Sequence, residues 1–396
     1  MNKQFLGGIL LIIGTCIGGG MLALPVVTAE TGFLNATMLL LIAFIVMTYS
    51  ALILTEVNLS VPPGSNLMSM AAATLGKPGV LVTWFVYLIL LYTLLSAYIA
   101  GGSELFVNLM RLIHISLTTQ IGAILFATLF AFFTYKGIGF VDLLNRGLMS
   151  GKMLAFILLC SLLVPHIESG NLHYGNWGNA NNALMMIFTA FGFGVIIPSI
   201  RDYFNNQAHQ IRLAVIIGSF VPLVCYAGWI AIVQSTVTSY GPHGLIAINH
   251  AEHPIALLVN IITEQIGNRW VGMFVYFFTS ICILTALLGV SLSLSDFLAD
   301  GLKRKLGLNQ FMITLLTFLP PLSVVLFKPD IFILGLSYAG ILCIMLLLLI
   351  PTLMVWSKRY IKKMPTTYQV FGGKICLASN LIAGVGLIIF GIYQLH

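Results

Sequence analysis

The sequence predicts an all-α integral membrane protein with about eleven transmembrane helices, and three observations support this fold class. Only 7% of the 396 residues are charged, against roughly 25% in a soluble domain. Hydrophobic residues make up 59% of the chain, and the mean hydropathy is +1.03. The apolar residues also gather in runs of about 20, the length at which a helix crosses the hydrocarbon core of a bilayer.

Eleven apolar runs approach this length. Each must be helical, because lipid offers no hydrogen-bond partner to an exposed backbone. Pro320 and Pro321 make the ninth run the least regular one. We expect the first run to be a transmembrane helix and not a cleaved signal peptide, since a second full span follows at once. The approximate bounds are 5–28, 33–58, 79–101, 120–135, 148–166, 183–200, 211–234, 271–295, 310–327, 331–356 and 375–394.

Positive charge is distributed unequally between alternate loops. One set of loops holds Arg111, Arg269 and Lys328, and the other set holds the remaining fifteen Lys and Arg residues. Because Lys and Arg concentrate on the cytoplasmic side, we expect a cytoplasmic N-terminus and an outer C-terminus. The net charge of +7 then faces anionic membrane lipid, and it does not indicate a nucleic-acid partner.

The cysteines and histidines do not form a recognisable site. All six Cys lie in or at the edge of predicted spans, so no disulfide framework is expected. We expect no metal ion and no cofactor, and we interpret five histidines of the outer loops as surface residues. The sequence has no HExxH motif, paired membrane-depth carboxylates or Ser–His pair, so an enzyme is not favoured. A channel would need a continuous polar pore lining, which the spans lack. The five histidines are His166, His173, His243, His250 and His253.

The first span is interrupted by the stretch GTCIGGGMLALP at 14–25. Within a helix, Gly costs about 1 kcal/mol relative to Ala and Pro about 3 kcal/mol. Either the small residues admit a neighbouring helix, or the helix is discontinuous. In the second case the N–H groups of a half-helix that begins near Gly19 would face an anion. The freed carbonyls of Thr15 and Cys16 would then accept from a cation, so a zwitterion would satisfy both.

The sixth span repeats this design in FTAFGFGVIIPSI at 188–200. The first and sixth spans open the two halves of a five-plus-five arrangement, and because five is odd the halves have opposite orientation. This pattern favours an inverted-repeat transporter with its site at the midplane of the membrane. We expect the first repeat over 1–168, the second over 181–356, and an extra C-terminal transmembrane helix over 374–396.

An ordered series of motifs runs through the whole chain. Besides the two interrupted spans, it comprises AYIAGGSELF at 97–106, VDLLNR at 141–146, IGSFVPLVCYAGW at 217–229, LLGVSLSLSDFLAD at 287–300 and FLPPLSVVLFKPD at 318–330. With these motifs the chain resembles the hydroxy/aromatic amino acid permeases of the amino acid–polyamine–organocation superfamily, and most of all the bacterial tyrosine permeases. The resemblance implies a fold of the leucine-transporter type, alternating access and proton-driven import of a tyrosine-like, tryptophan-like or hydroxy amino acid.

The resemblance also implies positions for the substrate. It places the α-carboxylate on the amides of Gly18, Gly19 and Gly20, and the α-ammonium on carbonyls around Cys16 and from Thr189 to Gly192. Two polar residues in the middle of the third span are further pocket candidates. Tyrosine permeases have a His after FGF where this chain has Gly194, so we expect a roomier pocket with relaxed specificity. The candidate substrate-binding residues are Thr15, Cys16, Gly18, Gly19, Gly20, Tyr92, Ser96, Thr189, Phe191, Gly192 and Gly194.

Lys152 lies in the fifth span, about 9 Å along the helix from Arg146. An ionisable group at this depth is a functional candidate, unless its long side chain reaches back to the membrane surface. In related proton-driven permeases a Lys on the fifth helix stands beside the breaks of helices one and eight. The resemblance therefore implies that Lys152 carries the coupling proton, with Thr285 and Ser291 as possible partners. Sodium coupling is the alternative, and only Lys152 argues against it.

Three carboxylates, of Glu56, Asp296 and Asp300, are expected at the cytoplasmic ends of their helices. They either pair with Arg146 or Lys303 as a cytoplasmic gate, or they belong to ordinary solvated helix ends. Asp142 and Arg146, four residues apart, are expected to pair along one helix.

Overall fold

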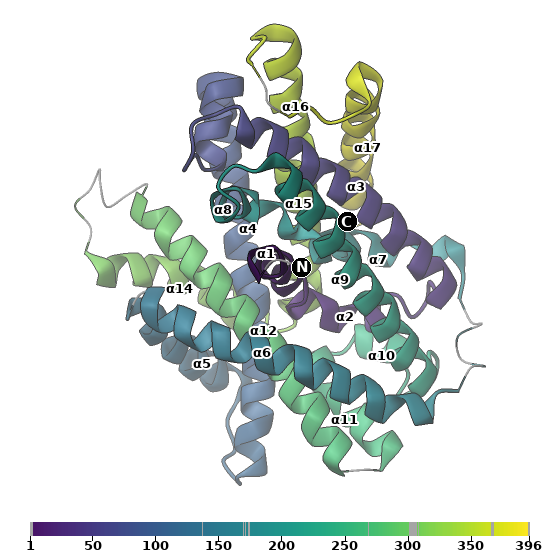
Figure 1. Ribbon diagram of the computed structural model, residues 1–396. Helices are drawn as coiled ribbons and strands as arrows, with labels where there is room; N and C mark the ends of the chain where they lie inside the picture. Colours follow the sequence, from purple (N-terminus) through teal and green to yellow (C-terminus); the bar gives the residue numbers. More distant parts are fainter. Residues whose placement is uncertain are drawn as a thin grey trace.

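The structure is a computed structural model that describes residues 3–136, 138–168, 170, 172, 175–267, 269–300, 307, 309–365 and 368–394. Within these ranges every regular element is a helix (Figure 1). The α-helices are α1 Lys3–Cys16, α2 Gly19–Val27, α3 Phe33–Leu59, α4 Leu67–Leu112, α5 Thr119–Tyr135, α6 Ile138–Leu163, α7 Asn181–Ala190, α8 Ile197–Tyr203, α9 Ala208–Thr236, α10 Leu245–Asn249, α11 Pro254–Ile266, α12 Arg269–Leu298, α14 Gln310–Phe327, α15 Ile331–Ile344, α16 Ile350–Trp356 and α17 Gly373–Gln394. Shorter 3₁₀ or π turns are η1 Val164–His166, η3 Trp177–Asn179, η4 Gly192–Ile196, η6 Met345–Leu349 and η7 Ser357–Ile361.

Most of the predicted spans are long apolar helices. In the described chain nine helical segments are long and apolar enough to cross a membrane, or ten if α1 and α2 form one bent span. Each of the eleven predicted runs is helical, although the first, sixth and tenth are divided into shorter elements. Helix α5 has only 17 residues and is shorter than the other spans. The run with Pro320 and Pro321 is one helix, α14. The all-helical membrane fold is confirmed, whereas the count of eleven stays a prediction.

Both predicted helix breaks are present. Helix α1 ends at Cys16, α2 begins at Gly19, and the two helix axes are bent by 52°. Gly18 between them has an extended backbone. The sixth span is interrupted more mildly: α7 ends at Ala190 and the 3₁₀ turn η4 separates it from α8, but residues 183–203 still form one helical segment. The helices are therefore discontinuous at both places. Close packing also applies at Gly14 and Gly19, where an added Cβ would meet Met149 and Tyr98.

Elements from the two halves of the chain are interleaved. Figure 1 shows α1 near the middle of the view with α9, α12 and α6 around it, and α17 at the periphery. Helix α1 packs against α9, α2 against α7, and α6 against α12. This arrangement brings both breaks into the interior. The inverted relation between the repeats, and their bounds at 1–168, 181–356 and 374–396, stay predictions.

The segment from 236 to 269 lies between two predicted spans, and its histidines were expected in an outer loop, but it contains α10 and α11. Helix α11 buries Ile255, Leu258, Val259 and Ile262, which follow the i, i+3, i+4, i+7 spacing of an amphipathic helix. With 13 residues it is too short to be recognised as a span. The expectation of a loop was wrong because a short helix that packs on the bundle needs only one apolar face.

Candidate functional site

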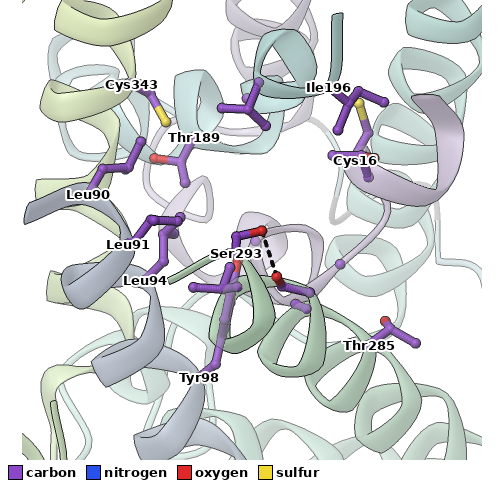
Figure 2. Close-up of a pocket in the computed structure, with 18 of the residues that line it drawn as sticks. Cys16, Leu90, Leu91, Leu94, Tyr98, Thr189, Ile196, Thr285, Ser293 and Cys343 are labelled. Carbon is purple, nitrogen blue, oxygen red and sulfur yellow. Dashed lines mark hydrogen bonds between the residues drawn. The ribbon is translucent and has the colours of Figure 1, made fainter. Parts of the chain in front are cut away.

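A cavity of about 250 Å³ lies between the two helix breaks. Its walls come from the break between α1 and α2, the break between α7 and η4, the middle of α4, the second half of α12, and Cys343 of α15. In Figure 2 the leucines Leu90, Leu91 and Leu94 of α4 lie on one side of the cavity, and Cys16 and Ile196 lie on the other. The interruptions thus meet at one place, as expected for a single binding site.

Six of the predicted substrate-binding residues line this cavity, all of them at the breaks. They are Thr15, Cys16, Gly18, Gly20, Thr189 and Gly192. The first N–H groups of a helix have no intrahelical acceptor, and no side chain caps the start of α2. This end of α2 therefore presents free amides and the positive end of a helix dipole, an arrangement that binds carboxylates.

Gly19 and Phe191, the other predicted residues at the breaks, lie behind the residues that line the cavity. A Cβ added to Gly19 would point at the ring of Tyr98, which lines the cavity. Phe191 is fully buried and packs edge-on against Tyr226, with ring centroids 5.3 Å apart. These two residues shape the site through their neighbours.

The structure corrects three pocket predictions. The hydroxyl of Tyr92 donates to the carbonyl of Leu316 at 2.8 Å, and the hydroxyl of Ser96 donates to the carbonyl of Tyr92 at 2.9 Å, so neither residue lines the cavity. A Cβ added to Gly194 would lie 3.3 Å from Cδ2 of Leu347. Position 194 therefore faces η6, and the expectation that its missing side chain enlarges the pocket was wrong.

Two stripes of lining residues were not predicted. On α4 the cavity is lined by Tyr87, Leu91, Leu94 and Tyr98, which follow the spacing of one helix face. On α12 it is lined by small residues at 285, 286, 289 and 293, where the hydroxyl of Ser293 donates to the carbonyl of Gly289 at 2.9 Å (Figure 2). Helical spacing of small residues on α12 is the signal that could have found the second stripe.

The cavity is open on one side. Thr15, Gly289 and Ser293 line it and are exposed, whereas Cys16 and Tyr98 line it and are buried. Ser293 lies near the C-terminal end of α12. The opening is therefore on the side of the molecule towards which α12 runs.

Lys152 of α6 is fully buried beside the first break. Its ammonium donates to the carbonyl oxygens of Gly14, at 3.3 Å, and of Ile17, and to the hydroxyl oxygen of Thr285, at 3.3 Å. The surface-reaching alternative was wrong, because the side chain is 0% exposed. Thr285 is the predicted partner on α12. Ser291, the other predicted partner, does not contact Lys152, because its hydroxyl pairs with that of Thr134 at 3.1 Å.

Tyr226 of α9 is a site residue that the sequence analysis missed. Its fully buried hydroxyl lies 2.7 Å from the carbonyl oxygen of Cys16 and 2.8 Å from that of Ala190. These two carbonyls end α1 and α7. A single hydroxyl from a third helix thus touches both breaks.

Glu56 forms a buried ionic cluster away from the cavity. Its carboxylate accepts from Lys358 at 3.2 Å, from the Arg359 guanidinium (Nε at 2.8 Å), and from the N–H of Val370 at 2.8 Å. The side chains of Glu56 and Lys358 are 0% exposed. Of the two alternatives for Glu56, the solvated helix end was wrong. Glu56 is paired, but its partners are Lys358 and Arg359 and not Arg146 or Lys303.

The remaining charged candidates are peripheral. Asp296 and Asp300 are exposed, as expected for solvated helix ends. The structure does not describe the side chains of Asp142, Arg146 and Lys303. The expected pairing of Asp142 with Arg146 therefore stays a prediction.

Among the described residues, no three His, Cys, Asp or Glu side chains lie close enough together to hold a metal ion. His173 lies outside the described residues. His253 lies beside a second cavity of about 630 Å³ at the ends of α4 and α11. Its Nδ1 is 4.0 Å from the carboxylate of Glu104, which is 4% exposed.

Two interrupted helices around a central cavity, in a bundle of apolar spans, define a multi-pass membrane transporter. The fold is that of the leucine-transporter type. The crystal structure of MhsT in complex with L-phenylalanine matches with a TM-score of 0.68 at 14% identity, over 100% of this chain and 99% of that one.

The family model described as "Tryptophan/tyrosine permease family" matches residues 1–391, and the chain belongs to that family. Tyrosine-specific transport system 2 of Haemophilus influenzae is 33% identical over 97% of this chain and 95% of its own length. Glutamine transporter 2 of Aliivibrio fischeri is 30% identical over 98% and 99%. A tryptophan-specific transport protein of Haemophilus influenzae is 28% identical over 97% and 94%. These relatives are named as transport proteins and not as enzymes.

Proposed function

We propose that this protein imports an aromatic or hydroxy amino acid across the bacterial inner membrane by proton symport with alternating access. The observation that carries the proposal is the position of Lys152, whose ammonium is bonded to two carbonyls of the first break, directly behind the cavity that joins both breaks. A proton carrier and a zwitterion site then share the same short piece of backbone.

The backbone on the cavity wall suits an amino acid. The amides of Gly18 to Gly20 at the start of α2 are donors for a carboxylate. The carbonyls at the ends of α1 and α7, around Cys16 and Thr189, are acceptors for an ammonium. The hydroxyl of Thr189 is already engaged, because it donates to the carbonyl of Leu336 at 2.7 Å. Recognition by backbone groups leaves the side chain of the substrate to the rest of the cavity.

The face opposite the breaks suits a large apolar side chain with one polar group. Leu90, Leu91 and Leu94 supply apolar surface, and Tyr87 and Ser293 supply polar atoms. Relatives named for tyrosine, tryptophan and glutamine differ in the side chain that they carry and share the zwitterion. We therefore favour tyrosine or tryptophan as substrate.

Proton coupling is favoured over sodium coupling by the occupancy of the freed carbonyls. Such carbonyls can coordinate a sodium ion in transporters with broken helices. Here the carbonyls of Gly14 and Ile17 accept from Lys152, and those of Cys16 and Ala190 lie at the hydroxyl of Tyr226. Because the oxygens of Gly14 and Ile17 already face the cation of Lys152, sodium is the second candidate.

The one-sided opening of the cavity fits one state of an alternating-access cycle. With the N-terminus in the cytoplasm, α12 runs inwards, so the open side at Ser293 faces the cytoplasm. A channel would need a path open on both sides. The side that holds Tyr98 is buried.

The test is uptake by proteoliposomes that contain the purified protein. A panel of labelled amino acids is offered while a pH gradient and a sodium gradient are imposed separately. We expect accumulation of L-tyrosine or L-tryptophan driven by an inward proton gradient in sodium-free buffer. Accumulation that requires sodium and ignores pH would establish the sodium-coupled alternative, and absence of uptake of every amino acid would refute the proposal.

A further inference from the structure

We infer that Tyr226 is a positioning residue of the substrate site, whose hydroxyl holds one carbonyl oxygen from each helix break in place to accept from the ammonium of the substrate. This inference rests on the proposed amino acid substrate. It adds a residue outside the two interrupted helices, on α9, and gives it a role in recognition of one end of the zwitterion.

The geometry brings three helices to one oxygen atom. The Tyr226 hydroxyl is 2.7 Å from the oxygen of Cys16 and 2.8 Å from the oxygen of Ala190. The two carbonyl oxygens can therefore be no farther apart than those two distances added together. Cys16 and Ala190 both line the cavity, whereas Tyr226 does not. The hydroxyl reaches the carbonyls from the side away from the substrate.

The count of donors and acceptors points to a further donor. A tyrosine hydroxyl carries one proton, so it donates to one of the two carbonyls at a time. Each carbonyl oxygen has two lone pairs, and as the last residues of α1 and α7 these carbonyls have lost the N–H partners that a continued helix would supply. A primary ammonium carries three N–H donors. It can satisfy from the cavity side the acceptors that the single hydroxyl proton leaves open.

The Tyr226 side chain is held rigidly enough for this role. It is 0% exposed, and its ring packs edge-on against Phe191, which lies within the second break. Fixing acceptors before the ligand arrives lowers the cost of ordering them on binding. Removal of the hydroxyl should therefore weaken recognition of the ammonium and leave recognition of the carboxylate and the side chain unchanged.

The experiment compares two probes on two variants. The probes are L-tyrosine and 3-(4-hydroxyphenyl)propionate, which is the same molecule without the ammonium. Tyr226→Phe should bind L-tyrosine roughly two- to tenfold more weakly, the range of one hydrogen bond, and should bind the propionate as wild type does. Tyr92→Phe is the matched control, because Tyr92 also donates to a backbone carbonyl at 2.8 Å but is outside the cavity.

A second variant restores a donor at the same place. Replacement of Tyr226 by 4-aminophenylalanine, whose amino group can donate to both carbonyls, should recover the affinity for L-tyrosine relative to the propionate. If Tyr226→Phe does not fold, the amino variant alone tests the inference by its relative affinity for the two probes.

The inference would be overturned if Tyr226→Phe changed the affinities for both probes equally. It would also be overturned if the amino variant bound the propionate more tightly than L-tyrosine. Either result would leave the proposed function intact. If the wild-type protein binds no amino acid of the panel, the proposed function falls, and the inference with it.

Discussion

The ring of Tyr98 occupies the space that a side chain at Gly19 would need. A Cβ added to Gly19 would lie 2.6 Å from Cε1 of Tyr98, a distance at which one of the two groups must move. Tyr98 is 7% exposed and lines the cavity. The first break and the third span therefore fix each other next to the proposed carboxylate site.

Gly19→Val should lower the affinity for the substrate by at least tenfold, because the ring of Tyr98 would be pushed into the cavity. Gly228→Val is the control, since an added Cβ there meets no atom within 4 Å and Gly228 does not line the cavity. Binding of labelled L-tyrosine to purified protein measures the effect, with thermal unfolding as a check on the fold. Equal affinities of the two variants would contradict the placement of the site.

Lys152→Ala should retain amino acid exchange and lose accumulation driven by a proton gradient. The variant lacks the titrating group but keeps the amides of α2. Lys152→Arg should also fail to accumulate substrate, because Arg does not release its proton in a protein. Exchange and concentrative uptake are measured in the same proteoliposomes, with Lys77→Ala as an exposed control. Concentrative uptake by either Lys152 variant would exclude Lys152 as the proton carrier.

Gly194→His should leave the order of preferred substrates unchanged and should lower stability, because the added side chain meets Leu347 in η6. Ser293→Ala should change the order, since Ser293 supplies a polar atom to the cavity. Competition of unlabelled amino acids against labelled uptake gives the order for each variant. A change at 194 together with none at 293 would show that the substrate side chain lies towards η6.

Glu56→Gln should destabilise the protein by about 3–5 kcal/mol, because it leaves the cations of Lys358 and Arg359 buried without a counter-charge. Asp300→Asn, which removes an exposed carboxylate, should have little effect. Thermal unfolding of both variants in detergent provides the comparison. A stability of Glu56→Gln equal to that of wild type would mean that the cluster is neutralised in another way.

The sequence by itself determined that the protein lies in a membrane, where its helices are and where two of them break. Apolar runs must be helical in lipid whatever they pack against. Gly18 to Gly20 and Gly192 lower the helix propensity of their spans, which is a local property. The six break residues that line the cavity were accessible to prediction for this reason, and Lys152 stood out because a charge is rare at membrane depth.

The tertiary structure alone decided which other helices complete the site. Tyr226 reaches both breaks from α9, and Tyr92 and Ser96 point away from the cavity that Tyr87 and Tyr98 line on the same helix. Likewise Glu56 finds its partners about 300 residues away in Lys358 and Arg359. The physical reason is that a helix rotation of one residue, 100°, exchanges the faces that meet a neighbour. In a chain that is apolar on every face, no local pattern of polarity sets that rotation.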